Sequence, residues 1–129
     1  MTQVEARERA LRLMVPATAE HLRTVRLVAA DAAERAGFDF EETADLRIAV
    51  DELAHVLMQV TDDPLLLGYT VCGSDVKVRG SAMRRAGGTG HSLSWWSQLI
   101  LGRVTDSFEL LDRDREVIFE LTKRHSRTP

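Results

Sequence analysis

The stretch that decides the fold runs from Asp39 to Val60 and reads DFEETADLRIAVDELAHVLMQV. Its apolar residues recur every three or four positions, which is the spacing of one face of an α-helix. Asp39 followed three residues later by Glu42 is typical of a capping box, which satisfies the first free amides of a helix. The sequence therefore predicts a long helix that buries one face. The residues of that face are Leu46, Ala49, Val50, Leu53, Val56, Leu57 and Val60.

Glu52 lies at the border of this apolar face. A step of 100° per residue places its carboxylate beside Val56, between the core and the solvent. Most carboxylates at such a border are ordinary solvated side chains. Glu52 becomes a candidate functional residue only through the residues that surround it.

Before this stretch, the pattern predicts a strand and then a helix. Leu11–Val15 alternates apolar and polar residues, as a half-buried strand does, and Pro16 ends it. Thr18 is a suitable N-cap for a helix that continues to about Ala36, and Gly37 suits the left-handed stop. Because only a short link separates this helix from the next, the two are expected to form an antiparallel hairpin.

After the long helix, the pattern changes to period 2. Asp62-Asp63-Pro64 ends the helix, and alternation resumes over Leu65–Val71 and Val76–Val78 around the turn Gly73-Ser74-Asp75. These segments predict a β-hairpin. The segment 80–92 is rich in glycine, serine and arginine and has no period, so a mobile loop is expected there.

The last third of the sequence predicts one more helix and a second hairpin. Ser92 is a candidate cap for a helix of about a dozen residues. Phe108–Leu111 and Glu116–Leu121 predict strands around the turn 112–114, and the segment 122–129 is expected to be a polar tail. The expected apolar face of the helix is Leu93, Trp96, Leu99 and Ile100.

These elements predict a single α+β domain over residues 1–129. The chain has 129 residues, 44% of them hydrophobic and 29% charged, which is typical of one soluble globular domain. Five strands and three amphipathic helices favour a two-layer sandwich, with a mixed, mostly antiparallel sheet covered on one face by three helices.

Composition argues against several classes of function. The net charge of −3 gives no broad footprint for nucleic acid or for an anionic membrane. No apolar run approaches the roughly 20 residues of a membrane helix, and no signal peptide opens the chain. The single Cys72 has no intrachain partner, and the four histidines lack metal-ligand spacing. We therefore expect a cytoplasmic protein without a metal site.

Three segments resemble the anti-sigma-factor serine kinases of bacteria, which belong to the histidine-kinase-like ATPase superfamily. They read VPATAEHLRTVR from Val15, ADLRIAVDELAHVL from Ala44 and VIFELTKR from Val117. The resemblance spans about residues 11–124. It implies a histidine-kinase-like ATPase fold and a protein that binds a sigma factor and keeps it from RNA polymerase. It also implies release by an anti-anti-sigma factor, which active members phosphorylate on serine with Mg-ATP, and a homodimer.

The nucleotide boxes of that family are poorly matched. Glu52 matches the glutamate that acts as general base, but Val56 stands where an asparagine would hold magnesium, and valine offers no oxygen ligand. The adenine-binding aspartate is missing from the segment 80–84. Ser94-Trp95-Trp96 stands at the glycine-rich phosphate box, and Glu116-Val117 replaces the final Gly-Thr.

The resemblance therefore implies a degenerate nucleotide pocket. Mg-ATP binding is expected to be weak or lost, so no cofactor is expected, and Glu52 is the vestige of a catalytic residue. If the pocket still functions, Glu52 is the base of a serine kinase with Mg-ATP as cofactor. The segment 87–90, Gly-Gly-Thr-Gly, could cradle phosphate, although short glycine clusters are more often linkers.

Recognition residues are then the remaining candidates. Arg23 and Arg26 lie about one turn apart on the first helix, and Arg26 stands at the family's separation from Glu52 for a partner-contacting arginine. Arginine is enriched at interface hot spots, but both residues would be ordinary solvated side chains without the resemblance. Trp96 is expected in the core, and Trp95 against the vacated pocket or a partner.

The remaining polar side chains are expected to have no specific role. Arg84 and Arg85 are expected to be solvated loop residues, and His55 an ordinary polar-face residue. The first functional hypothesis is an anti-sigma factor that acts by occlusion. The alternatives are an active serine kinase with an anti-anti-sigma substrate, and a sensor whose remodelled pocket holds another small molecule.

Overall fold

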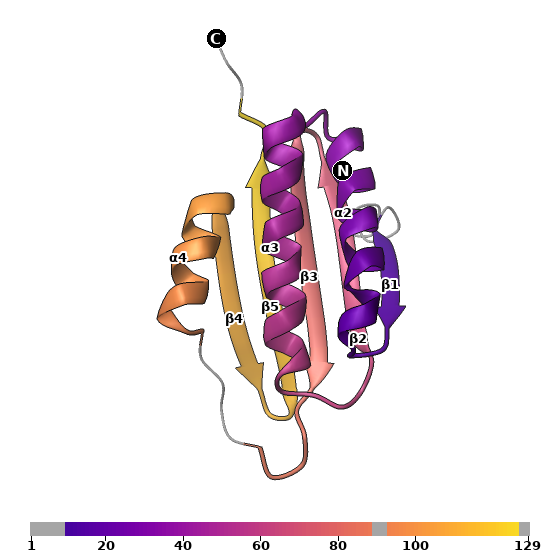
Figure 1. The fold of residues 1–129 in the computed structure, drawn as a ribbon, viewed down its shortest axis with the longest axis vertical. Helices are drawn as coiled ribbons and strands as arrows, with labels where there is room; N and C mark the ends of the chain where they lie inside the picture. The colour runs from indigo at the N-terminus through magenta and orange to yellow at the C-terminus, as the bar shows by residue number, and fades with distance from the viewer. Residues whose placement is uncertain (1–9, 89–92, 127–129) are drawn as a thin grey trace.

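The fold is a five-stranded sheet with three α-helices, seen in a computed structural model that describes residues 10–88 and 93–126 (Figure 1). In chain order the elements are β1 (Leu11–Val15), the short 3-10 helix η1 (Ala19–His21), α2 (Leu22–Arg35), α3 (Phe40–Met58), β2 (Leu65–Cys72), β3 (Asp75–Met83), α4 (Trp95–Val104), β4 (Ser107–Arg113) and β5 (Glu116–Arg124).

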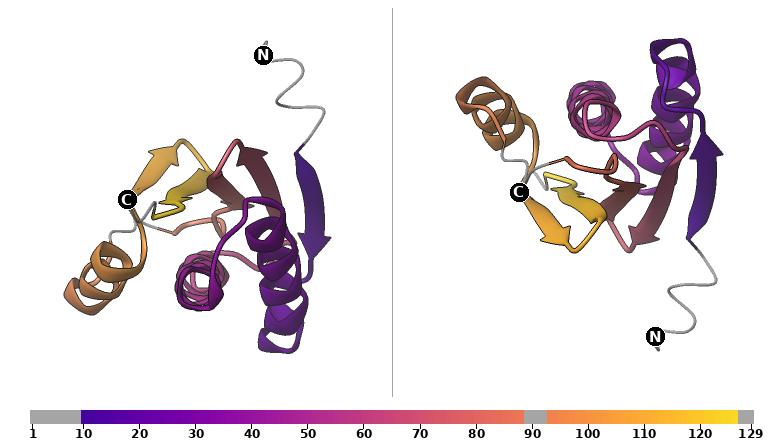
Figure 2. Two further views of the ribbon diagram at one scale, coloured as in Figure 1. Left: turned by 90° about the horizontal axis from the view of Figure 1, so that it is seen from above. Right: turned by 90° about the horizontal axis from the view of Figure 1, so that it is seen from below.

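The sheet has the strand order β1-β2-β3-β5-β4, and every neighbouring pair is antiparallel. The sequence had predicted a mixed sheet, and this part of the prediction is wrong. The strands of each hairpin are antiparallel because a short turn joins them. After the connection through α4, strand β5 also pairs with β3 in the antiparallel direction. The helices lie on one face, as the two end views show (Figure 2). The predicted two-layer α+β sandwich is confirmed.

Helix α3 supplies the centre of the core. Asp39 accepts a hydrogen bond from the Glu42 amide at 2.8 Å, and the Glu42 side chain accepts one from the Asp39 amide at 2.9 Å, so the capping box is present. The whole predicted apolar face of α3 is buried against the sheet and α2. Gly37 has a positive φ of 79° and ends the α2 segment as expected.

Helix α3 comes unusually close to β3, at Gly80. A Cβ atom on Gly80 would lie 2.6 Å from Leu53 Cδ2, 2.8 Å from Leu57 Cδ1 and 3.1 Å from Leu67 Cδ2. The predicted loop from residue 80 is therefore wrong at its start, because β3 continues to Met83. Gly80 serves here to admit the leucines of α3, not to break the strand.

Helix α4 begins later than the sequence predicted. Its N-cap is Ser94, whose side chain accepts a hydrogen bond from the Ser97 amide at 3.0 Å, while Ser92 lies outside the described residues. The buried side chains are Ser97, Leu101 and Val104, whereas Trp96 is 60% exposed. The buried face of α4 therefore differs from the predicted one. Helix α4 packs beside β4 and α3 at the border of the core, so only a narrow strip of its surface is buried.

The second hairpin is longer than expected. Strand β4 continues to Arg113, and the turn falls one residue later than predicted, with Asp114 at a φ of 54°. Strand β5 continues to Arg124, so the predicted polar tail begins three residues too early. After it, His125 Nδ1 lies 2.7 Å from Glu42 Oε1, and the Ser126 amide donates to Glu42 Oε2.

Glu42 therefore joins the start of α3 to the exit of β5, and its ionisation should stabilise the fold. Burial alone would raise its pKa, but hydrogen bonds from the Asp39 and Ser126 amides and from His125 lower the pKa to about 2, against 4.5 for a free glutamate. A lowered carboxyl pKa adds stability that is complete above pH 4.5 and is lost as the pH falls towards 2.

We expect Glu42→Gln to lower the free energy of unfolding at neutral pH by about 1 kcal/mol, the typical size of a lost helix cap. The difference from the parent protein should shrink as the pH falls from 4.5 to 2, because the unfolded parent binds a proton at Glu42 in this range while the folded parent resists it. Urea unfolding at several pH values measures it. Glu41→Gln is the matched control, because Glu41 is exposed in the same turn. A pH-independent difference would contradict the assignment.

Candidate functional site

A cleft of about 330 Å³ lies between α3 and α4. Helix α3 lines it with a carboxylate, an imidazole, an aliphatic side chain and an amide, and the start of α4 lines it with hydroxyl groups, an indole and a leucine. These residues are Glu52, His55, Val56, Gln59, Leu93, Ser94, Trp96 and Ser97. Glu52, predicted from the border of an apolar face, thus lies in the wall of a cleft, and His55 joins it there.

A chain of hydroxyl groups fixes the carboxylate in this cleft. The Ser94 hydroxyl donates to Ser97 Oγ at 3.1 Å, and the buried Ser97 hydroxyl donates to Glu52 Oε1 at 2.5 Å. Hydrogen bonds to an ionised acceptor are shorter and stronger than neutral ones, so this contact also ties α4 to α3. Ser97 was not predicted as a site residue, because its partner Glu52 lies 45 positions away in the sequence.

The cleft brings together only some of the residues that the family resemblance assigns to nucleotide boxes. Glu52 and Val56 lie in its wall, and Ser94 and Trp96 are also among the lining residues. Val56 is almost fully buried and presents only carbon to the cleft. Gly80 is not in the lining, since it is buried in β3 beneath α3. Of the segment 87–90, only Gly87 and Gly88 are among the described residues.

Both tryptophans are exposed at the start of α4. Trp96, predicted to be a core residue, lines the cleft and is 60% exposed. Trp95 is 73% exposed and is not part of the lining, so the expectation that it covers the vacated pocket is wrong. The ring centroids lie 6.1 Å apart with an interplanar angle of 43°. The buried side of α4 carries Ser97, Leu101 and Val104 in place of Trp96.

Arg26 lies on the seam between α2 and α3. Its Nη1 atom donates to both carboxylate oxygens of Asp51 at 3.1 Å, and both side chains are about one-third exposed. Arg23 is exposed on the outer side of α2. The structure therefore gives Arg26 an intramolecular partner that the sequence analysis did not identify. Asp51 could have been recognised as this partner, because it comes just before Glu52 on the side of α3 that faces α2.

Arg84 and Arg85 both make specific contacts that were not expected; the Arg84 side chain is largely covered, whereas Arg85 is an exposed loop residue as predicted. Arg84 pairs with Asp112 and donates to the Asp114 carbonyl at 3.0 Å. Arg85 donates from Nε to Asp62 at 2.9 Å and from Nη1 to the Gln59 carbonyl at 2.7 Å. The segment after β3 is thereby fastened to the carboxyl end of α3, where free helix carbonyls accept cationic donors.

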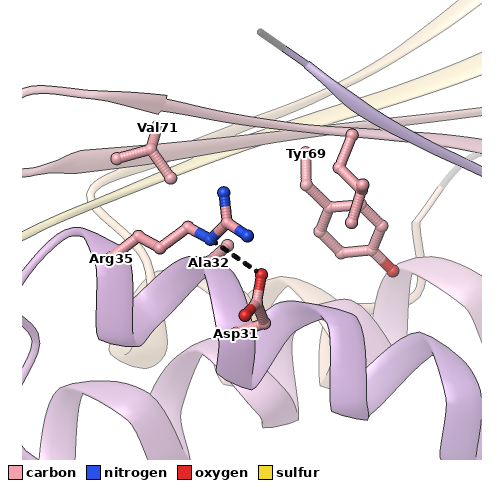
Figure 3. Close-up of a pocket in the computed structure, with 6 residues that line it drawn as sticks. Asp31, Ala32, Arg35, Tyr69 and Val71 are labelled. Carbon is pink, nitrogen blue, oxygen red and sulfur yellow. Dashed lines mark ion pairs between the residues drawn. The ribbon is translucent and has the colours of Figure 1, made fainter.

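A second cleft, of about 300 Å³, lies at the opposite edge of the helical layer between α2 and strands β1 and β2 (Figure 3). Its charged groups compensate each other, since Arg35 Nε lies 3.0 Å from Asp31 Oδ2. Tyr69 forms part of its wall and donates its hydroxyl to the Val25 carbonyl at 3.0 Å. Burial raises the pKa of Tyr69, so this hydroxyl stays protonated.

Two features bear on membranes and metals. Among residues 10–88 and 93–126, no helix has the length and apolar character needed to cross a bilayer. In the same ranges, no three histidine, cysteine, aspartate or glutamate side chains are placed to hold a metal ion.

The fold is similar to that of a solved structure, the RsbU and RsbW domains of Rv1364c from Mycobacterium tuberculosis. The TM-score is 0.70 at 17% sequence identity, and the match covers 89% of this chain and 31% of that one. The chain therefore spans about a third of the length of that structure. No protein-family model and no curated protein sequence matches the chain. The likeness establishes the fold, which is the α+β sandwich that the sequence predicted.

Proposed function

We propose that the protein is an anti-sigma factor that binds and sequesters a sigma factor, with Mg-ATP binding weak or lost. The fold shared with a structure that contains an RsbW domain supports the general class, a regulator that switches between protein partners. The finer assignment depends on the residues of the family resemblance. The observation that carries it is the α3–α4 cleft, where Glu52 is bonded to Ser97 and Val56 occupies the place of the metal ligand.

One feature of the cleft favours recognition over catalysis. A hard cation such as magnesium needs oxygen ligands, and the buried Val56 side chain has none. The alternative function, a serine kinase for an anti-anti-sigma factor, is favoured only by the presence of a carboxylate in the cleft.

We place the sigma-factor contact on the surface of α2 that runs from its seam with α3 outward, formed by Arg26, Arg23 and Leu27. Leu27 is exposed, which gives an apolar centre beside two guanidinium groups. Arginine beside exposed apolar surface is typical of interface hot spots. The ion pair with Asp51 holds the Arg26 side chain in one orientation, which lowers the entropy cost of binding. An anti-anti-sigma factor would compete for this face.

A homodimer is part of the same proposal. Met14 and Leu66 are opposite each other in the β1–β2 register, and both are exposed on the sheet face that no helix covers (Figure 2). A second copy of the chain could cover this apolar pair. Sedimentation velocity at several concentrations tests the dimer independently of any partner.

Binding experiments with nucleotide and sigma factor test the function. We expect no heat from calorimetric titration with millimolar Mg-ATP, and a complex with a sigma factor recovered by pull-down from the native cytoplasm. The affinity of that complex should not depend on nucleotide. Micromolar Mg-ATP binding that Glu52→Ala abolishes would overturn the proposal in favour of the kinase. Failure of every cellular sigma factor to bind would reject the anti-sigma role.

A further inference from the structure

The α3–α4 cleft has a one-sided charge. Of its eight lining residues, none is lysine or arginine, and Glu52 is the only carboxylate. Among the described residues, the hydrogen-bond partner of Glu52 is the neutral Ser97, and no cationic side chain lies within ion-pair distance of it. The cleft therefore holds a negative charge that the described part of the chain does not compensate.

Arg85, at the end of α3, does not supply the missing charge. Arg85 is bonded to the Gln59 carbonyl near one end of the cleft, but its guanidinium group is also paired with Asp62 and donates to the Thr61 carbonyl. It is not part of the lining. The cleft at the other edge differs in this respect, since Arg35 and Asp31 neutralise each other within one helix turn.

Trp96 gives the cleft a second feature of a cation site. Its indole lines the cleft and remains largely exposed, so one ring face is open to a ligand. The indole is the aromatic side chain that attracts cations most strongly, and guanidinium groups also stack on it. Val56 and Leu93 add apolar wall on which the carbon part of a ligand could pack.

Other ligand classes fit this lining poorly. A phosphate would meet the Glu52 carboxylate without a lysine or arginine in the lining to bind it. A metal ion would need more oxygen or nitrogen ligands than the single carboxylate arranged here, and no group of three is present in the described ranges. A neutral apolar ligand would bury the carboxylate without a counter-charge, which is unfavourable.

We propose that the α3–α4 cleft binds a small organic cation that carries a guanidinium or ammonium group. In this site Trp96 stacks on the cationic group and Glu52 Oε2 pairs with it. Ser97 is a positioning residue, because its hydroxyl holds Oε1 and so fixes the orientation of the carboxylate. The volume of about 330 Å³ is at the small end of ligand pockets. This inference does not rest on sigma-factor binding.

Agmatine and choline are suitable probes for the site, because they carry a guanidinium group and a quaternary ammonium group. One of the two tryptophans, Trp96, lines the cleft, so its fluorescence should change when a probe binds. Calorimetry measures the affinity. We expect saturable binding of at least one probe, and none of inorganic phosphate or ATP. Raising the salt concentration should weaken binding, since part of the attraction is between charges.

Three variants separate a specific site from general charge attraction. Glu52→Gln keeps an oxygen that accepts the Ser97 hydroxyl but removes the charge, and Trp96→Leu removes the aromatic face. Each should weaken binding by about tenfold. Trp95→Leu is the matched control, since Trp95 is exposed outside the cleft, and it should change affinity less than about twofold.

The outcomes that overturn the proposal are equally specific. They are no saturation by either cation, unchanged affinity in Glu52→Gln, or equal losses in Trp95→Leu and Trp96→Leu. Thermal unfolding by circular dichroism shows that each variant is folded before it is titrated. Sigma-factor binding is measured separately, so a protein that binds its partner but no cation refutes this inference alone.

Discussion

Replacing Gly80 with alanine is expected to lower the free energy of unfolding by about 1–3 kcal/mol, and valine should cost more. The added Cβ would meet Leu53 Cδ2 at 2.6 Å and Leu57 Cδ1 at 2.8 Å, both closer than van der Waals contact. These atoms end side chains that are fully buried, so they have little room to move. Denaturant unfolding followed by circular dichroism measures the change.

Gly68→Ala is the matched control for this prediction. Gly68 is on the neighbouring strand β2, and its side chain position faces away from α3. A Cβ there would meet only the Arg79 carbonyl oxygen, at 3.9 Å, which is an ordinary contact. We expect a change within about 0.5 kcal/mol, as for other surface substitutions. Equal losses in the two variants would show that strand propensity matters, and not the approach of α3.

Reversing the charge of Arg26 is expected to weaken sigma-factor binding by about a hundredfold or more. Arg26→Glu removes a guanidinium group from the proposed α2 face and places a second carboxylate beside Asp51. Like charges at an interface cost several kcal/mol, whereas a partly exposed ion pair contributes at most about 1 kcal/mol to folding. The variant should therefore fold and fail to bind. Arg26→Ala should weaken binding by about 1–3 kcal/mol.

Two further variants test whether Arg26 contacts the partner itself. Arg35→Glu makes the same charge change in the last turn of the same helix, on the flank that faces the second cleft, and should leave binding nearly unchanged. Asp51→Asn keeps Arg26 but removes its ion-pair partner, and should weaken binding less than Arg26→Ala does. If Arg35→Glu were as damaging as Arg26→Glu, net charge would explain the effect, and Arg26 would leave the proposed site.

The sequence predicted the features that depend on neighbouring residues. The capping box at Asp39 and Glu42, the buried face of α3 and the stop at Gly37 are all present. Each is encoded within one helical turn or by a repeated period, so no distant contact can easily override it. The number and order of the elements followed from the same local patterns.

The features that failed are those decided by distant segments. Gly80 looks like a strand end in the sequence, but α3 packs on it and β3 continues. Arg85 is a loop residue as expected, but the carbonyl group of Gln59 at the end of α3 accepts a hydrogen bond from it, which was not predicted. The α4 face depends on the bond between Ser97 and Glu52, which are 45 positions apart. No periodicity in the chain reports such pairings.

Local patterns predicted some residues of the candidate site, and contacts between distant segments decided the others. Glu52 could be identified because it stands at the edge of a periodic face, and Val56 because it lies one turn further along α3. Trp96 was assigned to the core, because it falls on the predicted apolar face of its helix with Leu93, Leu99 and Ile100. The partner of Arg26 was not foreseen, since Asp51 approaches it only when α2 and α3 form their hairpin.

The order of strands along the sheet has a consequence for how the chain folds. Strands β2 and β3 are adjacent in sequence, as are β4 and β5, so each hairpin can form by closing a short loop. The seam between β3 and β5 must instead enclose the whole segment that contains α4. The wall that α4 gives to the cleft thus belongs to the segment that this non-local pairing of β3 with β5 encloses, and a fragment that ends at β3 carries none of it.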